Sequence, residues 1–330
     1  MKTRDKVFEI LRANRDSWVS GEELSQGLGV SRAAVWKHVQ GLRQAGYIIE
    51  SAPRKGHRLV EVPPFLLPTE IRNRLGTSLW GNREIVHSFE VDSTNTKARS
   101  LVAEGAPQGT LVVAEYQTGG RGRLGRRWYS PPGQGLYLSL IIRPDLSLQE
   151  APKLNMLLAV VTAEATAEKS GQPVDLKWPN DIVINGRKAG GILIEIGSDM
   201  DRLEYAIAGV GLNVSTTRFP GSLNRSATSV FRESRRSISR TDLLQALLRR
   251  LEAAWDHQRA FGFRRVRRRY ADLTGLVGRP LRVQASGRTI AGRVKKINRF
   301  GALVVEDDQG RTSRVVSGDI LPEAEQAGGR

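Results

Sequence analysis

Residues 117–130 read QTGGRGRLGRRWYS, and this stretch decides between two different folds. Its glycines match the G-x-G-x-x-G spacing of a dinucleotide-binding turn, and it follows the β-rich run 111–116. A dinucleotide fold requires a helix directly after this turn, because the pyrophosphate sits at the N-terminus of that helix. The Pro-Pro-Gly at 131–133 cannot continue a helix, and another β-rich run follows it. The unit is therefore strand–loop–strand, and we reject the dinucleotide fold.

What remains is a glycine-rich loop, called the arginine loop (residues 117–130) below. It carries an aromatic residue, Trp128, and four arginines, Arg121, Arg123, Arg126 and Arg127. Glycines let backbone N–H groups approach a phosphate closely, and arginines clamp phosphate oxygens in bidentate fashion. The same arginines also suit a nucleic-acid backbone. We interpret the loop as one that closes over a nucleotide, with Trp128 covering the base or an apolar ligand.

Two further clusters carry polar chemistry. Residues 177–181 read KWPND and precede two β-rich runs joined by Asn185-Gly186, which is a strong hairpin signal. A lysine, an amide and a carboxylate at the start of a strand suit an ATP–metal site, although alone they also fit an ordinary turn. Residues 92–95 read DSTN and offer hydroxyls and an amide before an expected helix at 96–103. A simple helix cap is the alternative for this second cluster.

The N-terminal 62 residues predict a winged helix-turn-helix. Ser20 and Ser31 are expected N-caps of two short helices, Gly29 permits the turn between them, and a β-hairpin follows. Five polar residues are placed to meet DNA, three on the exposed face of the second helix and two at the hairpin tip: Arg32, Lys37, Gln40, Arg54 and Lys55. A winged helix used only for protein contacts is the alternative. Residues 62–64 read as a linker.

Helices are expected at 153–169 and at 242–260, the second capped by Thr241. From residue 276 the pattern changes to short β-rich runs separated by glycine-containing turns, which predicts a small β-barrel. The tail 323–330 is expected to be disordered. The run of arginines within 264–269 falls on an expected helix and is interpreted as a solvated face.

The composition narrows the class of protein. The formal net charge of +17 favours anionic partners, and it is spread along the chain rather than concentrated at one end. The absence of cysteine excludes disulfides, thiolate metal sites and a cysteine nucleophile. No signal peptide and no membrane span are recognised, so we expect a cytoplasmic protein with no membrane partner.

Together the motifs resemble the bifunctional biotin–protein ligases that also act as biotin operon repressors. The resemblance covers nearly the whole chain: the winged helix, DSTN, GRGRxGRxWxSPxG, KWPND, GRKxxGILxE, GxGxN at 209–213 and a small C-terminal β domain. It implies an α+β protein of three domains. These are a winged helix-turn-helix in residues 1–64, a mixed-sheet ligase domain like the class II synthetases in 65–273, and an SH3-like β-barrel in 274–330.

The resemblance also implies a two-step reaction: biotin and ATP form biotinoyl-5′-AMP, and a lysine of the biotin carboxyl carrier domain of acetyl-CoA carboxylase, or of a related carboxylase, then takes the biotin. The residues implied to contact biotin are Ser93, Thr94, Asn95, Gln117, Arg121, Gly122, Arg123 and Lys188. Those implied to contact ATP or the adenylate are Arg123, Arg126, Trp128, Lys177, Asn180 and Asn213. The catalytic set implied is Arg123, Lys177, Asp181 and Lys188, with Asp181 facing Mg²⁺.

The implied partners are the biotin carboxyl carrier protein, operator DNA and a second copy of the chain when the adenylate is bound. The loop 214–228 is expected to help enclose the nucleotide and to be mobile without it. Two other readings stay open at this point, namely a ligase whose DNA-binding domain is vestigial and a ligand-sensing transcription factor that does not catalyse. Lipoate ligases share the catalytic architecture, but the arginine loop together with KWPND favours biotin.

Overall fold

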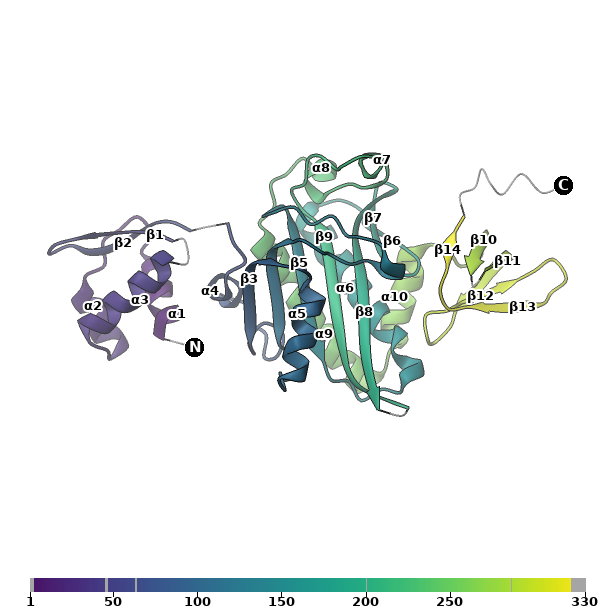
Figure 1. Cartoon of the computed structure of the whole chain (residues 1–330), viewed down its shortest axis with the longest axis horizontal. Helices are drawn as coiled ribbons and strands as arrows, with labels where there is room; N and C mark the ends of the chain where they lie inside the picture. Colours follow the sequence, from purple (N-terminus) through teal and green to yellow (C-terminus); the bar gives the residue numbers. More distant parts are fainter. Residues whose placement is uncertain (1–2, 45–46, 63, 200, 286, 322–330) are drawn as a thin grey trace. The chain divides into compact units, whose positions relative to one another are not determined.

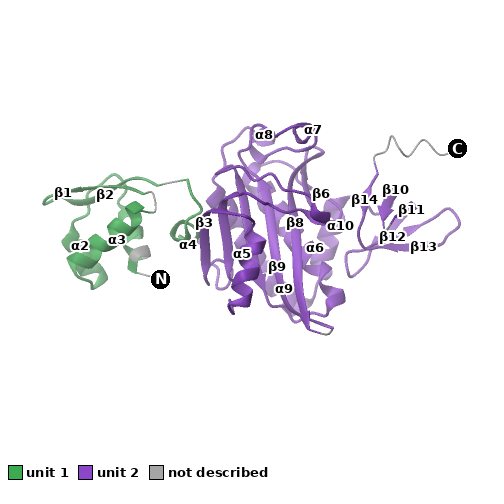
Figure 2. Ribbon diagram, in the orientation of Figure 1, with its two compact units in different colours: residues 1–74 green, residues 75–330 purple. Residues whose placement is uncertain are grey.

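The computed structural model describes residues 3–44, 47–62, 64–199, 201–285 and 287–321. The chain divides into two compact units, residues 1–74 and residues 75–330 (Figure 2). The tail at 323–330 and Pro63 of the expected linker lie outside the described residues. None of the helices in the described ranges is both long and apolar enough to cross a membrane.

The first unit is a winged helix. Its elements are α1 (Thr3–Ala13), α2 (Gly21–Leu28), α3 (Arg32–Gln44), β1 (Ile48–Ala52), β2 (Gly56–Glu61) and α4 (Pro68–Arg72), with β1 and β2 antiparallel. The predicted caps are confirmed, because Ser20 Oγ accepts from the Glu23 amide at 3.0 Å and Ser31 Oγ accepts from the Ala34 amide at 3.1 Å. Gly29 ends α2 in the left-handed conformation at φ 63°. Helix-turn-helix and hairpin therefore form from local signals.

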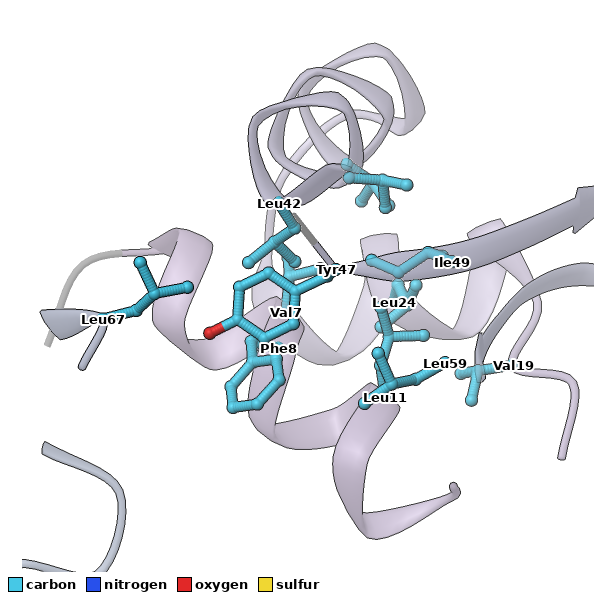
Figure 3. Packing of buried hydrophobic residues seen from close by; sticks show 12 residues of the cluster. Val7, Phe8, Leu11, Val19, Leu24, Leu42, Tyr47, Ile49, Leu59 and Leu67 are labelled. Atoms are coloured by element: carbon cyan, nitrogen blue, oxygen red, sulfur yellow. The ribbon is translucent and has the colours of Figure 1, made fainter. Parts of the chain in front are cut away.

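An apolar core joins the helices and the hairpin of this unit (Figure 3). Its buried members come from α1, α2, α3, the hairpin and the segment after it: Val7, Phe8, Leu11, Val19, Leu24, Val35, Val39, Leu42, Tyr47, Ile49, Leu59 and Leu67. Glu70 on α4 accepts from the Tyr47 hydroxyl at 2.9 Å and pairs with Arg12 at 2.7 Å. Burial raises the pKa of Glu70 even though both contacts oppose that shift. Residues 67–70 thus pack with the winged helix. The domain boundaries expected from the sequence, after residues 64 and 273, remain predictions.

The second unit is built on a sheet of seven strands, which is mixed, as predicted. Its strands are β3 (Ile85–Val91), β4 (Leu111–Gln117), β5 (Gly135–Ile142), β6 (Asp175–Lys177), β7 (Asp181–Ile184), β8 (Arg187–Asp199) and β9 (Arg202–Asn213). The strand order is β3-β4-β5-β9-β8-β7-β6, in which only β3 and β4 run parallel. Asn185 and Gly186, both at positive φ, form the predicted turn between β7 and β8.

Helices cover both faces of this sheet, with α5 in front of it and α6 and α9 behind it in the view of Figure 1. They are α5 (Thr94–Ala103), α6 (Pro152–Ser170), α9 (Arg240–Phe261) and α10 (Arg264–Thr274); shorter pieces are η1 (Arg123–Gly125), η2 (Leu148–Glu150), α7 (Leu223–Ser226) and α8 (Val230–Ser234). Helix α6 packs against α9 and α10, and α5 packs against β4, β5 and β9. The arginine run falls on α10, as predicted, and most of its side chains are exposed.

Two helices, α9 and α5, each begin two residues before the predicted start. Helix α9 is capped by Ser239, whose Oγ accepts from the Asp242 amide at 3.2 Å, and not by Thr241. Its first residue, Arg240, is buried because its guanidinium pairs with Glu115 at 2.6 Å. Helix α5 begins at Thr94 rather than at residue 96, since the free Thr94 amide finds a partner in the Gln117 side chain at 2.9 Å.

The C-terminal segment forms an antiparallel sheet of order β13-β12-β11-β10-β14. Its strands are β10 (Pro280–Ala285), β11 (Arg288–Ile297), β12 (Leu303–Glu306), β13 (Thr312–Val315) and β14 (Asp319–Ile320). The first four were predicted, and β14 was missed because it is only two residues long. The SH3-like closure of this sheet stays a prediction. Trp178 Nε1 donates to the Gly301 carbonyl at 3.0 Å and so ties this sheet to the KWPND segment.

Candidate active site

A cavity of about 470 Å³ lies in the second unit, among the arginine loop, α5, strands β7 to β9 and the loop that follows β9. Every residue predicted from the sequence to contact biotin or the nucleotide lines this cavity: Ser93, Thr94, Asn95, Gln117, Arg121, Gly122, Arg123, Arg126, Trp128, Lys177, Asn180, Asp181, Lys188 and Asn213. These residues span more than a hundred positions of the chain, and the sheet brings them together. Their individual roles stay predictions.

At one end of the cavity the lining residues are polar and buried, and they form hydrogen bonds with one another. The Thr94 amide at the start of α5 donates to Gln117 Oε1 at 2.9 Å, and Gln117 Nε2 donates to Ser130 Oγ at 2.9 Å. Ser93, Thr94, Asn95 and Gln117 are all less than one-tenth exposed. The DSTN segment is therefore more than a helix cap, because its side chains form a fixed polar surface inside the cavity.

The arginine loop is held in shape by its own backbone. The Gly122 amide donates to the Arg126 carbonyl at 2.7 Å, and the Trp128 amide donates to the Gly120 carbonyl at 2.8 Å. Leu124 at its apex has φ 56° and is 78% exposed. Three of the loop's four arginines, Arg121, Arg126 and Arg127, are exposed, and all four line the cavity. Its first part is also tied to the sheet, because the Thr118 amide donates to the Val91 carbonyl of β3 at 2.9 Å. The loop thus presents positive charge on a backbone that is held both by its own hydrogen bonds and by the sheet.

The indole of Trp128 packs onto β9, where Gly211 leaves room for it. A Cβ atom at Gly211 would lie 2.7 Å from Trp128 Nε1. The ammonium of Lys188 lies 5.5 Å from the Trp128 ring centroid, which is a cation–π distance. Trp128 Nε1 is buried and finds no hydrogen-bond partner among the described residues. The strand, the indole and the lysine therefore form one wall of the cavity.

The opposite end collects positive charge. Lys188 Nζ lies 2.7 Å from Asp181 Oδ1, and Arg123 Nη1 donates to Asn180 Oδ1 at 3.0 Å. Asn180 Nδ2 in turn donates to the Ile192 carbonyl at 2.7 Å, which fixes its orientation. Lys177 lines the same region. The KWPND segment and the arginine loop, which are separated in sequence by about fifty residues, thus meet through Arg123 and Asn180.

Asn213 ends β9 and holds the loop that follows. Its side-chain amide donates to the Thr228 carbonyl at 3.0 Å. Glu233 on α8 accepts from Thr228, Asn185 and Arg187, which ties this loop to the β7–β8 turn. Burial tends to raise the pKa of Glu233, but these hydrogen bonds and nearby arginines outweigh it and lower the pKa. The loop 214–228 is part of the described structure, and its predicted mobility stays a prediction.

The C-terminal sheet contributes residues that sequence reasoning missed. Arg126 Nη2 pairs with Asp319 Oδ2 at 2.8 Å, and Arg123 Nη2 donates to Ser317 Oγ. Further residues around the cavity that were not predicted include Arg187, Phe219, Arg225, Gly318 and Ile320. No local pattern marks Ser317 or Asp319, because they lie about 190 residues from their partners and only the folded chain brings them together.

The predicted DNA-contacting residues fall on one unit and are mostly exposed. Lys37 on α3 is exposed, as are Arg54 and Lys55 at the tip of the β1–β2 hairpin. Arg32 is also exposed but pairs with Glu22 at 2.8 Å, and Gln40 is half-buried. An exposed pair of this kind adds little stability, so Arg32 can exchange its partner for a phosphate at small cost.

Comparison with known proteins supports both a ligase domain and a helix-turn-helix domain in this chain. Residues 88–213 match the model of the biotin/lipoate A/B protein ligase family, and residues 3–58 match a helix-turn-helix domain model. The chain is 37% identical over 319 residues to the bifunctional ligase/repressor BirA of Bacillus subtilis, covering 96% of this chain and 98% of the relative. It is 32% identical over 289 residues to BirA of Escherichia coli, covering 88% of each chain.

A solved structure agrees as well. The biotin protein ligase of Aquifex aeolicus in complex with biotin and ATP superposes with a TM-score of 0.63 at 26% identity, over 72% of this chain and 97% of that one. Fold and site thus define a protein ligase domain joined to a helix-turn-helix domain. The chain belongs to the family of bifunctional biotin–protein ligase/repressors.

Proposed function

We propose that this chain activates biotin with ATP, transfers it to a lysine of a biotin carboxyl carrier domain, and binds operator DNA according to its ligand state. The main observation that supports the proposed ligase activity is the cavity and the residues that line it. A buried polar surface at one end and a cationic cluster at the other suit a ligand with a polar ring and a carboxylate at the end of an apolar chain, next to a nucleotide.

In the first step a carboxylate oxygen of biotin attacks the α-phosphorus of ATP, the bond to the β-phosphate oxygen breaks, and pyrophosphate leaves. Two anions must approach each other, so cations near both lower the barrier. Lys188 and Arg123 would take this role, and the support for it is that each contacts a residue of the KWPND segment and both line the cavity. In the second step the carrier lysine attacks the acyl carbon and AMP leaves. The substrate supplies the nucleophile, so no residue of the chain needs to form a covalent bond.

The donor set at the cationic end fits Mg²⁺ that arrives bound to ATP. Mg²⁺ is usually held by one or two carboxylates together with substrate phosphates and water. Asp181 supplies a carboxylate and Asn180 an amide oxygen within the cavity lining. Among the described residues no group of three or more His, Cys, Asp or Glu side chains that could hold a metal ion occurs. The remaining ligands would be phosphate oxygens of ATP and water. The ion would supply charge neutralisation, and Lys177 would add to it.

The arginine loop has a second task, which is to keep water from the adenylate. The mixed anhydride is prone to hydrolysis, and closure of a site over such an intermediate suppresses this side reaction. Trp128 and Arg126 lie where the loop borders the cavity. The loop would cover the adenine and the phosphate with these two side chains.

Incubation of the protein with biotin, Mg·ATP and an apo carrier domain tests the enzymatic half. Biotin should appear on a single carrier lysine, and pyrophosphate should be released only when biotin is present. No carrier labelling under conditions in which a known biotin ligase labels it would overturn the proposal.

We infer that the winged helix serves regulation. The exposed cations of α3 and of the hairpin tip would contact the major groove and the phosphates, and their exposure supports this role. Two winged helices at a fixed spacing read a palindrome, so adenylate binding is expected to promote a homodimer. A gel shift with the chain's own biotin-operon promoter, with and without biotinoyl-5′-AMP, tests this. Equal weak binding in both states would favour a ligase with a vestigial DNA-binding domain.

A further inference from the structure

A chain of polar side chains runs from the polar end of the cavity to a carboxylate outside it. Asn95 Nδ2 donates to Glu195 Oε2 on β8 at 2.9 Å. Asn95 Oδ1 lies 2.6 Å from Ser139 Oγ, which lies 2.8 Å from Thr94 Oγ1. Asn95, Ser139 and Thr94 are at most 4% exposed. Glu195 is not among the residues that line the cavity.

The chemistry of these groups fixes the direction of every proton. A carboxylate only accepts hydrogen bonds, so the Asn95 amide nitrogen must face Glu195 and its oxygen must face Ser139. That oxygen also only accepts, so Ser139 donates its single proton there. Thr94 must then donate its own proton to Ser139. The contact between Thr94 Oγ1 and Gln117 Oε1 is longer, at 3.3 Å, as expected when neither atom donates to the other.

This arrangement leaves two acceptors facing the cavity. Thr94 Oγ1 keeps its lone pairs, and Gln117 Oε1 keeps one lone pair beside the one used by the Thr94 amide. A cyclic urea carries two N–H donors. We propose that Glu195 is a positioning residue that, through Asn95 and Ser139, makes this end of the cavity an acceptor of two N–H groups. The proposal rests on the placement of the biotin ring at this end, as proposed above.

The substitution Glu195→Gln reverses the direction with almost no change in shape. Arg99 donates to Glu195 Oε1 at 2.7 Å, so a glutamine would turn its carbonyl toward Arg99 and its amide toward Asn95. Asn95 must then flip, and Ser139 donates to Thr94 instead. The Thr94 proton then points either at Gln117 Oε1 or into the cavity. In both cases one of the two acceptors is lost.

Calorimetric titration of biotin into the full-length protein without ATP measures the effect. Loss of one neutral hydrogen bond predicts about five- to tenfold weaker binding for Glu195→Gln. The KM for ATP at saturating biotin should not change. The sharpest variant is Arg99→Ala/Glu195→Gln, in which the glutamine is free to turn its carbonyl toward Asn95. We expect this double variant to regain most of the affinity, and Arg99→Ala alone to bind biotin like the parent protein.

A purely structural role for Glu195 predicts the opposite, because the double variant loses two partners and should bind biotin more weakly than Glu195→Gln. That result would overturn the proposal. Thr94→Val separates it from the placement of biotin. Unchanged biotin affinity in Thr94→Val would contradict the placement of the biotin ring beside Thr94. A loss in Thr94→Val with none in Glu195→Gln would contradict only the hydrogen-bond relay, that is, the ordered hydrogen bonds from Glu195 through Asn95 and Ser139 to Thr94. If the relay acts through Thr94, adding Glu195→Gln to Thr94→Val causes no further loss.

Discussion

Two glycines of β9 lie beside different parts of the cavity lining, Gly209 beside Asn95 and Gly211 beside Trp128. Substitution of each glycine should therefore affect a different ligand. Gly209 and Gly211 lie two residues apart on β9, so they face the same side of the sheet. A methyl group at Gly211 would lie 2.7 Å from Trp128 Nε1 and 2.8 Å from its Cε2. A methyl group at Gly209 would overlap Asn95 Oδ1 more severely still. Gly211→Ala should therefore impair nucleotide binding, and Gly209→Ala should impair biotin binding.

The magnitude follows from the overlap. Carbon contacts are favourable at about 3.5–4.0 Å, so the indole must shift by about 1 Å to admit the methyl group. Overpacking of this kind costs about 1–3 kcal/mol. At about 1.4 kcal/mol for each tenfold change, ATP binding should weaken by about five- to a hundredfold. The glycine at 209 faces a tighter contact with a buried amide, so a loss in biotin affinity of at least this size is expected.

Biotin-dependent ATP–pyrophosphate exchange gives the KM for each substrate, and calorimetry gives the biotin affinity. Gly211→Ala should raise the KM for ATP and leave biotin affinity within about twofold, and Gly209→Ala should do the reverse. Gly27→Ala on α2 is the control, because a methyl group there would meet no atom within 4 Å. If each β9 variant changes the KM for ATP and the biotin affinity to the same extent, the assignment of one end of the cavity to biotin and the other to the nucleotide is wrong.

Three further predictions concern charge. Arg123→Ala should weaken retention of biotinoyl-5′-AMP more than binding of biotin alone, and equal losses by calorimetry would contradict its contact with both carboxylate and phosphate. Lys55→Ala should weaken DNA binding for all sequences alike and lower the slope of log affinity against log salt by about 1, as measured by titration at several salt concentrations. Glu252 accepts from the amides of Ser78, Leu79 and Trp80, and these bonds outweigh burial and lower its pKa. A lowered folded-state pKa stabilises the fold above the usual pKa and loses that effect as pH falls through the folded value. Glu252→Gln should thus lower the melting temperature at pH 7, with a difference that narrows below about pH 4; a constant difference would refute this.

Much of the fold follows from local signals. The caps at Ser20 and Ser31, the left-handed Gly29 and the Asn185-Gly186 turn each act within a few residues, so the sequence alone predicts them correctly. The strand–loop–strand nature of 111–142 likewise follows from the prolines after the arginine loop. Element starts are predicted less accurately, because a buried partner such as Glu115 for Arg240 can extend a helix past its predicted cap.

The candidate site was predictable where short motifs carry its chemistry, and all of those motif residues line one cavity. What the sequence did not reveal are partners brought in from distant segments. Ser317 and Asp319 carry no motif, yet they contact the arginine loop. Glu195 lies in the GRKxxGILxE motif, but only its contacts with Asn95 and Arg99 suggest a role. Such roles depend on tertiary distances, which residue spacing does not encode.

The most direct test of the central claim is mass spectrometry of an apo carrier domain after incubation with the protein, biotin and Mg·ATP. We predict one added biotin on one lysine, dependent on ATP, and a large loss of labelling in the variant Lys188→Ala. An unmodified carrier, while a known biotin ligase modifies it under the same conditions, would contradict the claim that this chain transfers biotin to a carrier lysine.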